Sequence, residues 1–149
     1  MNFSKFQRTG TTTVLVASVL VIFSACSAEK ERGVNDIGND QVAAMIGPSK
    51  APLLLDVRSA REFEGGHIPG SVNIPHDQLA SRIGEIAMHR ERGVIVYCER
   101  GGRAAKAAAI LQDEGFASIQ HMEGDMTGWR MAGLPTEWGG QQLWTWRSS

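Results

Sequence analysis

The sequence predicts an α/β domain built on a parallel sheet that helices cover on both faces. The first observation is that short apolar segments, typical of buried strands, alternate along the chain with segments of helical spacing. The second is that glycine or proline ends most of these segments. With 149 residues, of which 42% are hydrophobic and 21% are charged, the chain has the composition of one folded domain with a short remainder.

Five segments are expected to form strands. The most strand-like is Gly93–Tyr97, which is apolar and rich in β-branched residues. Pro52–Val57 is an apolar run that ends in a charge, as buried parallel strands do. The other three are the shorter segments Val34–Ile37, Ser71–Ile74 and Ser118–Met122.

Four segments are expected to form helices, namely Gly38–Gly47, Asp77–His89, Arg103–Gly115 and Gly124–Gly133. The second of them places Leu79, Ile83 and Ile86 on one face. The third is rich in alanine and ends at a glycine, which makes it the clearest helix of the chain. Arg61–Gly70, which glycines and a proline interrupt, is expected to be a turn or a short helical piece.

Residues 1–25 have the pattern of a secretory signal peptide. Lys5 and Arg8 precede the apolar stretch Val14–Phe23, and the small residues Ser24 and Ala25 follow it. An uncleaved membrane anchor is the alternative. The apolar stretch is only about half of the ~20 residues that a helix needs to cross a bilayer, which favours export.

The segment Phe23–Cys26, "FSAC", resembles the lipobox of bacterial lipoproteins, in which the cysteine is lipidated and becomes the new N-terminus. The sequence therefore predicts a lipid-attachment cysteine and tether over 26–33, a folded domain over 34–136 and a Trp-rich tail over 137–149. It also predicts attachment at the periplasmic face of a bacterial membrane, with simple cleavage of the signal as the alternative. The tail either folds back over the domain or lines a docking surface for an acceptor.

Charge and histidine spacing argue against two classes of function. Loss of the signal peptide takes the formal net charge from −1 to about −3, whereas a nucleic-acid-binding protein normally presents a basic surface. We therefore expect no nucleic-acid partner. His76, His89 and His121 are scattered without the spacing of metal ligands, so we expect neither a metal site nor a cofactor.

Cys98 is the one cysteine besides Cys26, and it follows directly after the strand expected over Gly93–Tyr97. An unpaired cysteine in an exported protein either pairs between chains or remains a free thiol. The alternative is a cysteine that is buried in the apolar core and only contributes to packing. Ligands of open parallel sheets gather beyond the carboxyl ends of the strands, so we expect the thiol at a site-forming edge and not inside the core.

The loop Cys98–Arg103, "CERGGR", runs from a strand into the first turn of a helix, where backbone N–H groups lack intrahelical partners. Gly101 and Gly102 have no Cβ and can turn successive N–H groups inward. This environment favours the thiolate over the thiol and makes the sulfur nucleophilic. Glu99 opposes the effect, but we expect the donors and Arg103 to outweigh it.

Three segments of the chain resemble single-domain rhodaneses, the sulfurtransferase family. They are Leu53–Pro75, Val94–Phe116 and Gly124–Pro135, and the resemblance as a whole covers Val34 to Pro135. It implies a three-layer α/β rhodanese-like fold with a central five-stranded parallel sheet and helices on both faces.

The resemblance also implies an activity. Cys98 would attack a sulfane-sulfur donor such as thiosulfate, hold the sulfur as a persulfide and pass it to cyanide, a thiol or a protein acceptor. Arg103 would close the loop and bind an anionic donor. The backbone amides that would cradle the persulfide belong to Glu99, Arg100, Gly101, Gly102 and Arg103. Asp56 and Arg58 would support the site through hydrogen bonds that fix neighbouring loops, not through catalysis.

Two alternatives are weighed against this activity. Cell-cycle dual-specificity phosphatases resemble rhodaneses but have one more residue between cysteine and arginine, and tend to have histidine where Tyr97 stands. The six residues from Cys98 to Arg103 resemble the sulfur-handling version. A non-catalytic, membrane-anchored binding or sensor module is the other alternative, against which the presence of Cys98 argues.

Overall fold

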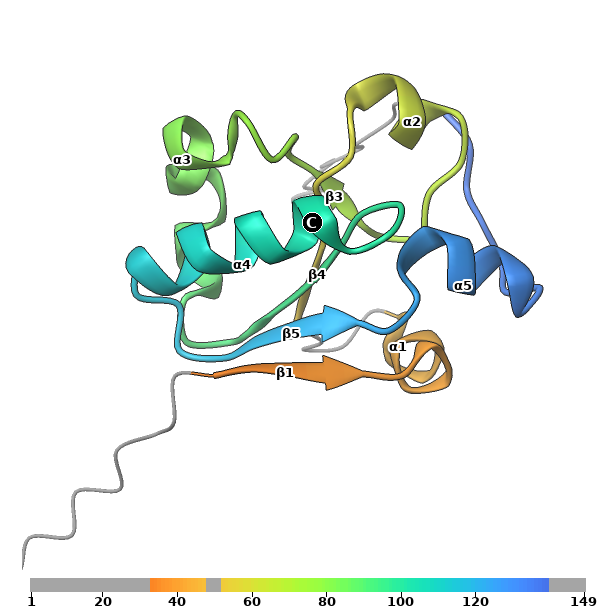
Figure 1. Cartoon of the computed structure of the whole chain (residues 1–149), viewed down its shortest axis with the longest axis horizontal. Helices are drawn as coiled ribbons and strands as arrows, with labels where there is room; N and C mark the ends of the chain where they lie inside the picture. Colours follow the sequence, from red (N-terminus) through yellow and green to blue (C-terminus); the bar gives the residue numbers. More distant parts are fainter. Residues whose placement is uncertain (1–32, 48–51, 140–149) are drawn as a thin grey trace, which may run out of the picture.

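A five-stranded, wholly parallel sheet forms the centre of the protein (Figure 1). The structure, a computed structural model, describes residues 33–47 and 52–139. The strand order is β1-β5-β4-β2-β3, with β4 at the centre. The strands are β1 (Val34–Ile37), β2 (Leu53–Asp56), β3 (Val72–Asn73), β4 (Val94–Tyr97) and β5 (Ile119–Met122). Each lies within a segment predicted as a strand.

The helices also follow the predicted order, with one correction. They are α1 (Asn39–Met45), α2 (Ala60–Glu64), α3 (Leu79–Arg82), the 3₁₀ helix η1 (Ile83–His89), α4 (Gly102–Asp113) and α5 (Asp125–Met131). The prediction of one continuous helix over Asp77–His89 is wrong, because the chain changes from α to 3₁₀ geometry at Ile83. Gly84, a poor helix former, lies just after the change, and the three-residue period of a 3₁₀ helix aligns Ile83 with Ile86.

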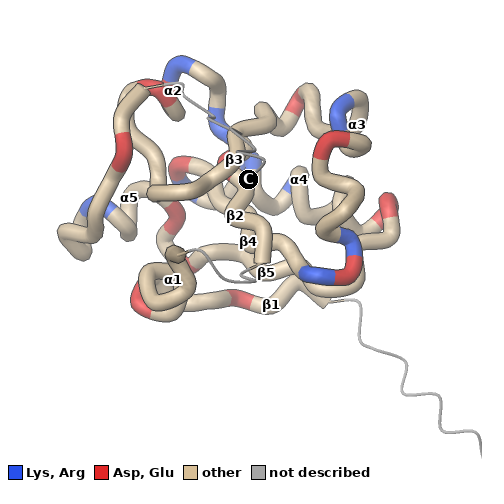
Figure 2. Tube along the Cα trace, turned by 180° about the vertical axis from the view of Figure 1, so that it is seen from behind, with Lys and Arg blue, Asp and Glu red and all other residues tan. Residues whose placement is uncertain are grey.

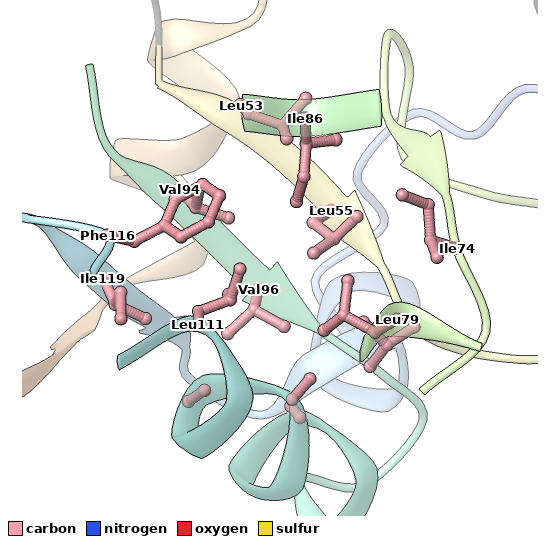
Figure 3. Packing of buried hydrophobic residues seen from close by; sticks show 14 of the residues in the cluster. Leu53, Leu55, Ile74, Leu79, Ile86, Val94, Val96, Leu111, Phe116 and Ile119 are labelled. Atoms are coloured by element: carbon pink, nitrogen blue, oxygen red, sulfur yellow. The ribbon is translucent and has the colours of Figure 1, made fainter. Parts of the chain in front are cut away.

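One face of the sheet packs against α3, η1 and α4 (Figure 3). Side chains alternate along β4, and Val94 and Val96 point to this face. Leu79 of α3, Ile86 of η1 and Leu111 of α4 are buried against the sheet there.

The opposite face packs against α1 and α5. Ile95 of β4 contributes to this second cluster together with Val42 of α1 and Met126 of α5. Trp129 of α5 is fully buried there, and its indole N–H donates to the carbonyl oxygen of Pro135 at 2.8 Å. The predicted three-layer fold, with a parallel sheet and helices on both faces, is confirmed.

The parallel strands bring three loops to one edge of the sheet, because all carboxyl ends lie on the same side. The β4 strand ends at Cys98, β2 leads through Arg58 to α2, and β5 leads through Gly124 to α5. These three loops form the site described below. Basic and acidic residues are interspersed along the trace (Figure 2).

The segment after α5 returns along the domain toward α2 (Figure 1). Glu137 pairs with His67 through two backbone hydrogen bonds of 2.9 Å, and the Gly139 N–H donates to the Glu64 carbonyl at 3.0 Å. The Trp138 ring lies against Gly66 yet remains 75% exposed. The described beginning of the predicted tail therefore folds back onto the domain.

The predicted signal peptide, Cys26 and most of the tether and tail lie outside the described residues. Within residues 33–47 and 52–139, none of the helices is long and apolar enough to span a bilayer.

Candidate active site

Cys98 lies between β4 and α4 and lines a pocket. The pocket has a volume of about 410 Å³ and is lined by Cys98, Glu99, Arg100, Gly102, Arg103 and Lys106. Cys98 is 1% exposed and also packs with the apolar residues between the sheet and α4. The sequence placed the thiol at a site-forming edge as opposed to the core, and the structure places it at the boundary of both.

The backbone of the loop directs a hydrogen bond at the sulfur. The Gly101 N–H donates to Cys98 Sγ at 3.1 Å, a contact that stabilises a sulfur anion more than a neutral thiol. Gly101 has φ +93°, and an added Cβ would lie 3.2 Å from Asp125 Oδ2, so glycine is required for both conformation and space. Glu99, Arg100, Gly102 and Arg103 supply the other backbone amides of the loop, and those of Gly102 and Arg103 lie in the first turn of α4, where amides lack partners within the helix.

The Glu99 carboxylate is held by neighbours on other elements. Its oxygens contact Arg58 Nη1 at 3.4 Å, Thr127 Oγ1 at 3.3 Å and the guanidinium of Arg130. Two guanidinium groups therefore contact the acid of the loop, and one of them, Arg58, is also paired with Asp56. The Glu99 carboxylate is therefore engaged by side chains of other elements.

Arg103 is engaged more fully than the sequence indicated. Its Nη1 and Nη2 donate to Glu62 Oε2 and Oε1 at 2.7 and 2.8 Å. The hydrogen bonds with Glu62 raise the pKa of Arg103. The neighbouring Cys98 raises this pKa further. The hydrogen bonds from Arg103, aided by Ser59, hold the pKa of Glu62 well below its usual range. Arg103 still lines the pocket, but its charge is shared with an acid.

Two other basic residues line the pocket with no ion pair in the described part of the chain. Arg100 and Lys106 are both exposed, and neither takes part in a salt bridge there. Lys106 lies three residues beyond Arg103 on α4 and hence on the same side of the helix. Lys106 is not among the site residues predicted from the sequence, although its helical spacing from Arg103 was a usable signal.

Asp56 and Arg58 form a buried ion pair behind the loop. Arg58 Nε lies 3.1 and 3.0 Å from the two carboxylate oxygens of Asp56, and Nη2 donates to Asp56 Oδ2 at 2.7 Å and to the Gly66 carbonyl at 2.9 Å. Burial lowers the pKa of Arg58, but the hydrogen bonds and charge of Asp56 outweigh it, so the net shift is upward. Since Arg58 also contacts Glu99, the pair ties the β2–α2 loop to the cysteine loop.

Asp125 is a second residue that the sequence analysis missed. Its Oδ1 accepts the backbone N–H of Cys98 at 2.7 Å, across 27 positions of sequence. A signal existed, because an acidic residue follows Gly124 at the carboxyl end of β5, the strand that pairs with β4.

Two of the histidines, His67 and His121, make local contacts. His67 Nδ1 lies 2.9 Å from the Phe63 carbonyl oxygen and its ring stacks on Phe63, while His121 lies between Asp36 and Asp125. In the ranges that the structure describes, no three or more His, Cys, Asp or Glu side chains are grouped to hold a metal ion.

Comparison with known proteins agrees with this geometry. The profile of the family described as Rhodanese-like domain matches residues 38–132, more than half of the chain. A protein of Allochromatium vinosum named Sulfurtransferase is 29% identical over 102 residues, which cover 68% of this chain and 94% of that protein.

Solved structures have the same fold. A rhodanese-related protein from Thermoplasma volcanium has a TM-score of 0.60 and 30% identity, covering 69% of this chain and 97% of that one. A thiosulfate sulfurtransferase from Pseudomonas aeruginosa has a TM-score of 0.63 but 23% identity, and the match covers 72% of this chain and 20% of that one, which is a likeness of fold alone. These similarities support a sulfurtransferase-type activity in broad terms. The chain belongs to the rhodanese-like domain family.

Proposed function

We propose that this protein moves sulfane sulfur from an anionic donor such as thiosulfate to a thiophilic acceptor through a persulfide on Cys98. The observation that carries the proposal is the hydrogen bond from Gly101 N–H to Sγ of Cys98, which lines the pocket. The loop also runs into the first turn of α4, whose backbone amides lack partners within the helix and would stabilise a sulfur anion.

The first half-reaction transfers one sulfur atom to the enzyme. The Cys98 thiolate attacks the outer sulfur of thiosulfate and forms an S–S bond. The S–S bond of thiosulfate breaks, and sulfite leaves with the electron pair. The negative charge then lies on the outer sulfur of the persulfide, where several N–H donors stabilise it better than one.

The second half-reaction returns the enzyme to its starting state. A nucleophile such as cyanide attacks the outer sulfur and forms thiocyanate, while Cys98 leaves as the thiolate. A thiol acceptor, free or on a protein, would take the sulfur as a persulfide in the same way. No external oxidant or reductant is needed, because the sulfur atom changes partners in both steps.

The charges at the pocket fit an anionic donor. Arg100 and Lys106 supply positive charge that no described acid neutralises, whereas Arg103 is paired with Glu62. We assign the attraction of the donor mainly to Arg100 and Lys106, and the shaping of the loop to Arg103. This changes the emphasis of the sequence analysis, which gave both tasks to Arg103.

We also propose that the protein is exported and held at the periplasmic face of a membrane by a lipid on Cys26. The basic start, the apolar stretch and "FSAC" support this proposal. The lipid would keep the domain at the membrane surface while the pocket remains open to small solutes and to protein acceptors.

The test is mass spectrometry of the purified full-length protein after incubation with thiosulfate. We expect Cys98 to gain one sulfur atom and to lose it on addition of cyanide. Cys98→Ser should gain none while retaining the fold, whereas the matched variant Cys26→Ser should still be modified at Cys98. Modification of Cys98→Ser to the same extent would contradict the assignment.

A second experiment tests the cations. Arg100→Gln and Lys106→Gln should each raise the KM for thiosulfate about two- to fivefold, as expected for partly screened charges. Arg92→Gln is the matched control, because Arg92 precedes β4 and lies at the opposite end of the strand from Cys98. If no sulfane donor modifies Cys98, the alternative of an anchored binding or sensor module is favoured; release of phosphate from an aryl phosphate would favour the phosphatase.

A further inference from the structure

We propose that Asp125 is a positioning residue for Cys98, whose carboxylate holds the thiol-bearing backbone in the conformation that directs Gly101 N–H at Sγ. The inference rests on the proposed function of Cys98 but adds a residue from another element, 27 positions away in sequence. Its role follows from hydrogen bonds on both sides of Cys98 and from the backbone of Asp125 itself.

Residues at the start of α5 form hydrogen bonds with the backbone of Cys98 and Glu99, the two residues that follow β4. The Cys98 N–H donates to Asp125 Oδ1 at 2.7 Å, and the Cys98 carbonyl accepts the Met126 N–H at 3.1 Å. Thr127 donates to the Glu99 carbonyl through its N–H at 3.3 Å and its Oγ1 at 2.8 Å. Of these contacts, the Asp125 carboxylate alone depends on the chemistry of an acidic side chain.

The same carboxylate lies beside the glycine that contacts the sulfur. A Cβ on Gly101 would lie 3.2 Å from Asp125 Oδ2. Asp125 is 2% exposed and therefore cannot swing into solvent without disturbing its packing. It thus contacts Cys98 with one oxygen and borders Gly101 with the other.

His121 orients the carboxylate. His121 Nε2 lies 3.1 Å from Asp125 Oδ2, and His121 Nδ1 lies 3.5 Å from Asp36 Oδ1. The contact with Oδ2 leaves Oδ1 directed at the Cys98 N–H. A buried carboxylate needs such partners, since an unpaired one is costly to bury.

The backbone of Asp125 shows that an uncommon conformation is maintained at this position. Asp125 has φ +52°, and it is the one non-glycine residue with a positive φ in the described part of the chain. Aspartate and asparagine tolerate this region better than other non-glycine residues, and glycine adopts it freely. Glycine would therefore adopt this backbone conformation equally well. What aspartate adds at this position is its carboxylate side chain.

This comparison suggests the experiment. Asp125→Gly preserves the backbone conformation and removes the acceptor, whereas Asp125→Asn keeps both an acceptor oxygen and the tolerance of positive φ. In the full-length protein, we expect Asp125→Gly to lower kcat for sulfur transfer by at least about tenfold, because small displacements of reacting groups have large effects on rate. The KM for thiosulfate should change less than about threefold, since Arg100 and Lys106 remain in place. Asp125→Asn should keep at least about a third of kcat.

The direct readout is the amide proton of Cys98 by NMR. A short hydrogen bond to a carboxylate should place this proton far downfield and slow its exchange with solvent. Asp125→Gly should move the resonance upfield and speed exchange, while the control Asp113→Asn, an exposed residue at the end of α4, should change neither. Thermal unfolding of each variant checks that the fold is retained.

Three results would overturn the inference: an Asp125→Gly protein with kcat within twofold of wild type, a Cys98 amide that does not respond to Asp125→Gly, or an Asp125→Asn protein as inactive as Asp125→Gly. Should Asp125→Gly fail to fold, the activity and amide shift of Asp125→Asn decide the question. If the wild-type protein transfers no sulfur at all, the proposed function fails. The amide shift and the rate of Cys98 alkylation by iodoacetamide in the variants would then still test the positioning role.

Discussion

Glu62 and Arg103, which are 41 positions apart in the sequence, meet in a two-pronged ion pair with N···O distances of 2.7 and 2.8 Å. The pair joins α2 to the first turn of α4, at the edge of the pocket that Cys98 lines. The Glu62 carboxylate thus binds the guanidinium group of Arg103, the last residue of the loop. This arrangement reduces the net positive charge that an anion would meet at Arg103.

Glu62→Gln should release that charge. The variant keeps an acceptor for the Ser59 N–H at the start of α2, because glutamine serves in a capping box as glutamate does. We expect the KM for thiosulfate to fall about two- to fivefold, and the free energy of unfolding to fall by about 0.5–1 kcal/mol, as for other partly exposed pairs. Steady-state kinetics and urea unfolding measure the two effects.

The matched control is Glu64→Gln, which removes an exposed acid on the same helix that forms no ion pair in the described part of the chain. It should leave KM and stability near wild type. An equal fall in KM for both variants would mean that net charge, and not the pairing of Arg103, sets the affinity for thiosulfate.

The ion pair also predicts how stability depends on pH. The folded-state pKa of Glu62 lies below its ordinary value of about 4.3. A carboxyl group with a lowered folded-state pKa contributes stability above its unfolded-state pKa and loses that contribution as the pH falls toward the folded-state pKa. The difference in unfolding free energy between wild type and Glu62→Gln should therefore be constant from about pH 7 to 5 and shrink below about pH 4. Urea titrations across this range test it, and a difference that grew toward acid pH would contradict the pairing.

The two glycines of the loop should respond oppositely to alanine. Gly101→Ala introduces a Cβ at φ +93° that would lie 3.2 Å from Asp125 Oδ2. We expect a loss of about 1–3 kcal/mol of stability. Sulfur transfer should also fall strongly, because the Gly101 N–H would move from Sγ.

Gly102→Ala is the comparison. Gly102 begins α4, and an added Cβ would meet nothing within 4 Å. Alanine there should leave stability unchanged or raise it by about 0.4–1 kcal/mol. Thermal unfolding and sulfur-transfer assays on both variants measure these effects. Equal losses of stability and activity in Gly101→Ala and Gly102→Ala would contradict the prediction.

Membrane attachment is tested at Cys26. Cys26→Ala should prevent lipidation and move the protein from the membrane fraction to the soluble fraction, since an apolar stretch about half the length of a membrane span holds a chain poorly. Fractionation with immunodetection measures this. A variant that still resists extraction from membranes by carbonate would indicate an uncleaved anchor helix.

Local pattern alone predicted the strands, most of the helices and the strand end after which the thiol lies. The apolar alternation of strand β4, the alanine-rich α4 and the glycines between them are properties of neighbouring residues. A parallel sheet puts its strand ends on one edge, so the position of Cys98 after Tyr97 sufficed to place it at a pocket. The number of residues from Cys98 to Arg103 favours the sulfur-handling version over the phosphatase version, which stays a prediction.

The tertiary structure alone decided which side chains meet at that edge. The partner of Arg103 comes from α2 and the acceptor for the Cys98 N–H comes from α5, and both distances depend on how helices far apart in sequence dock on the sheet. The positive φ of Asp125 and the near-complete burial of Cys98 also depend on the tertiary structure. Periodicity is a property of consecutive residues, whereas side-chain pairing depends on the strand order β1-β5-β4-β2-β3 and on the packing of the helices across it.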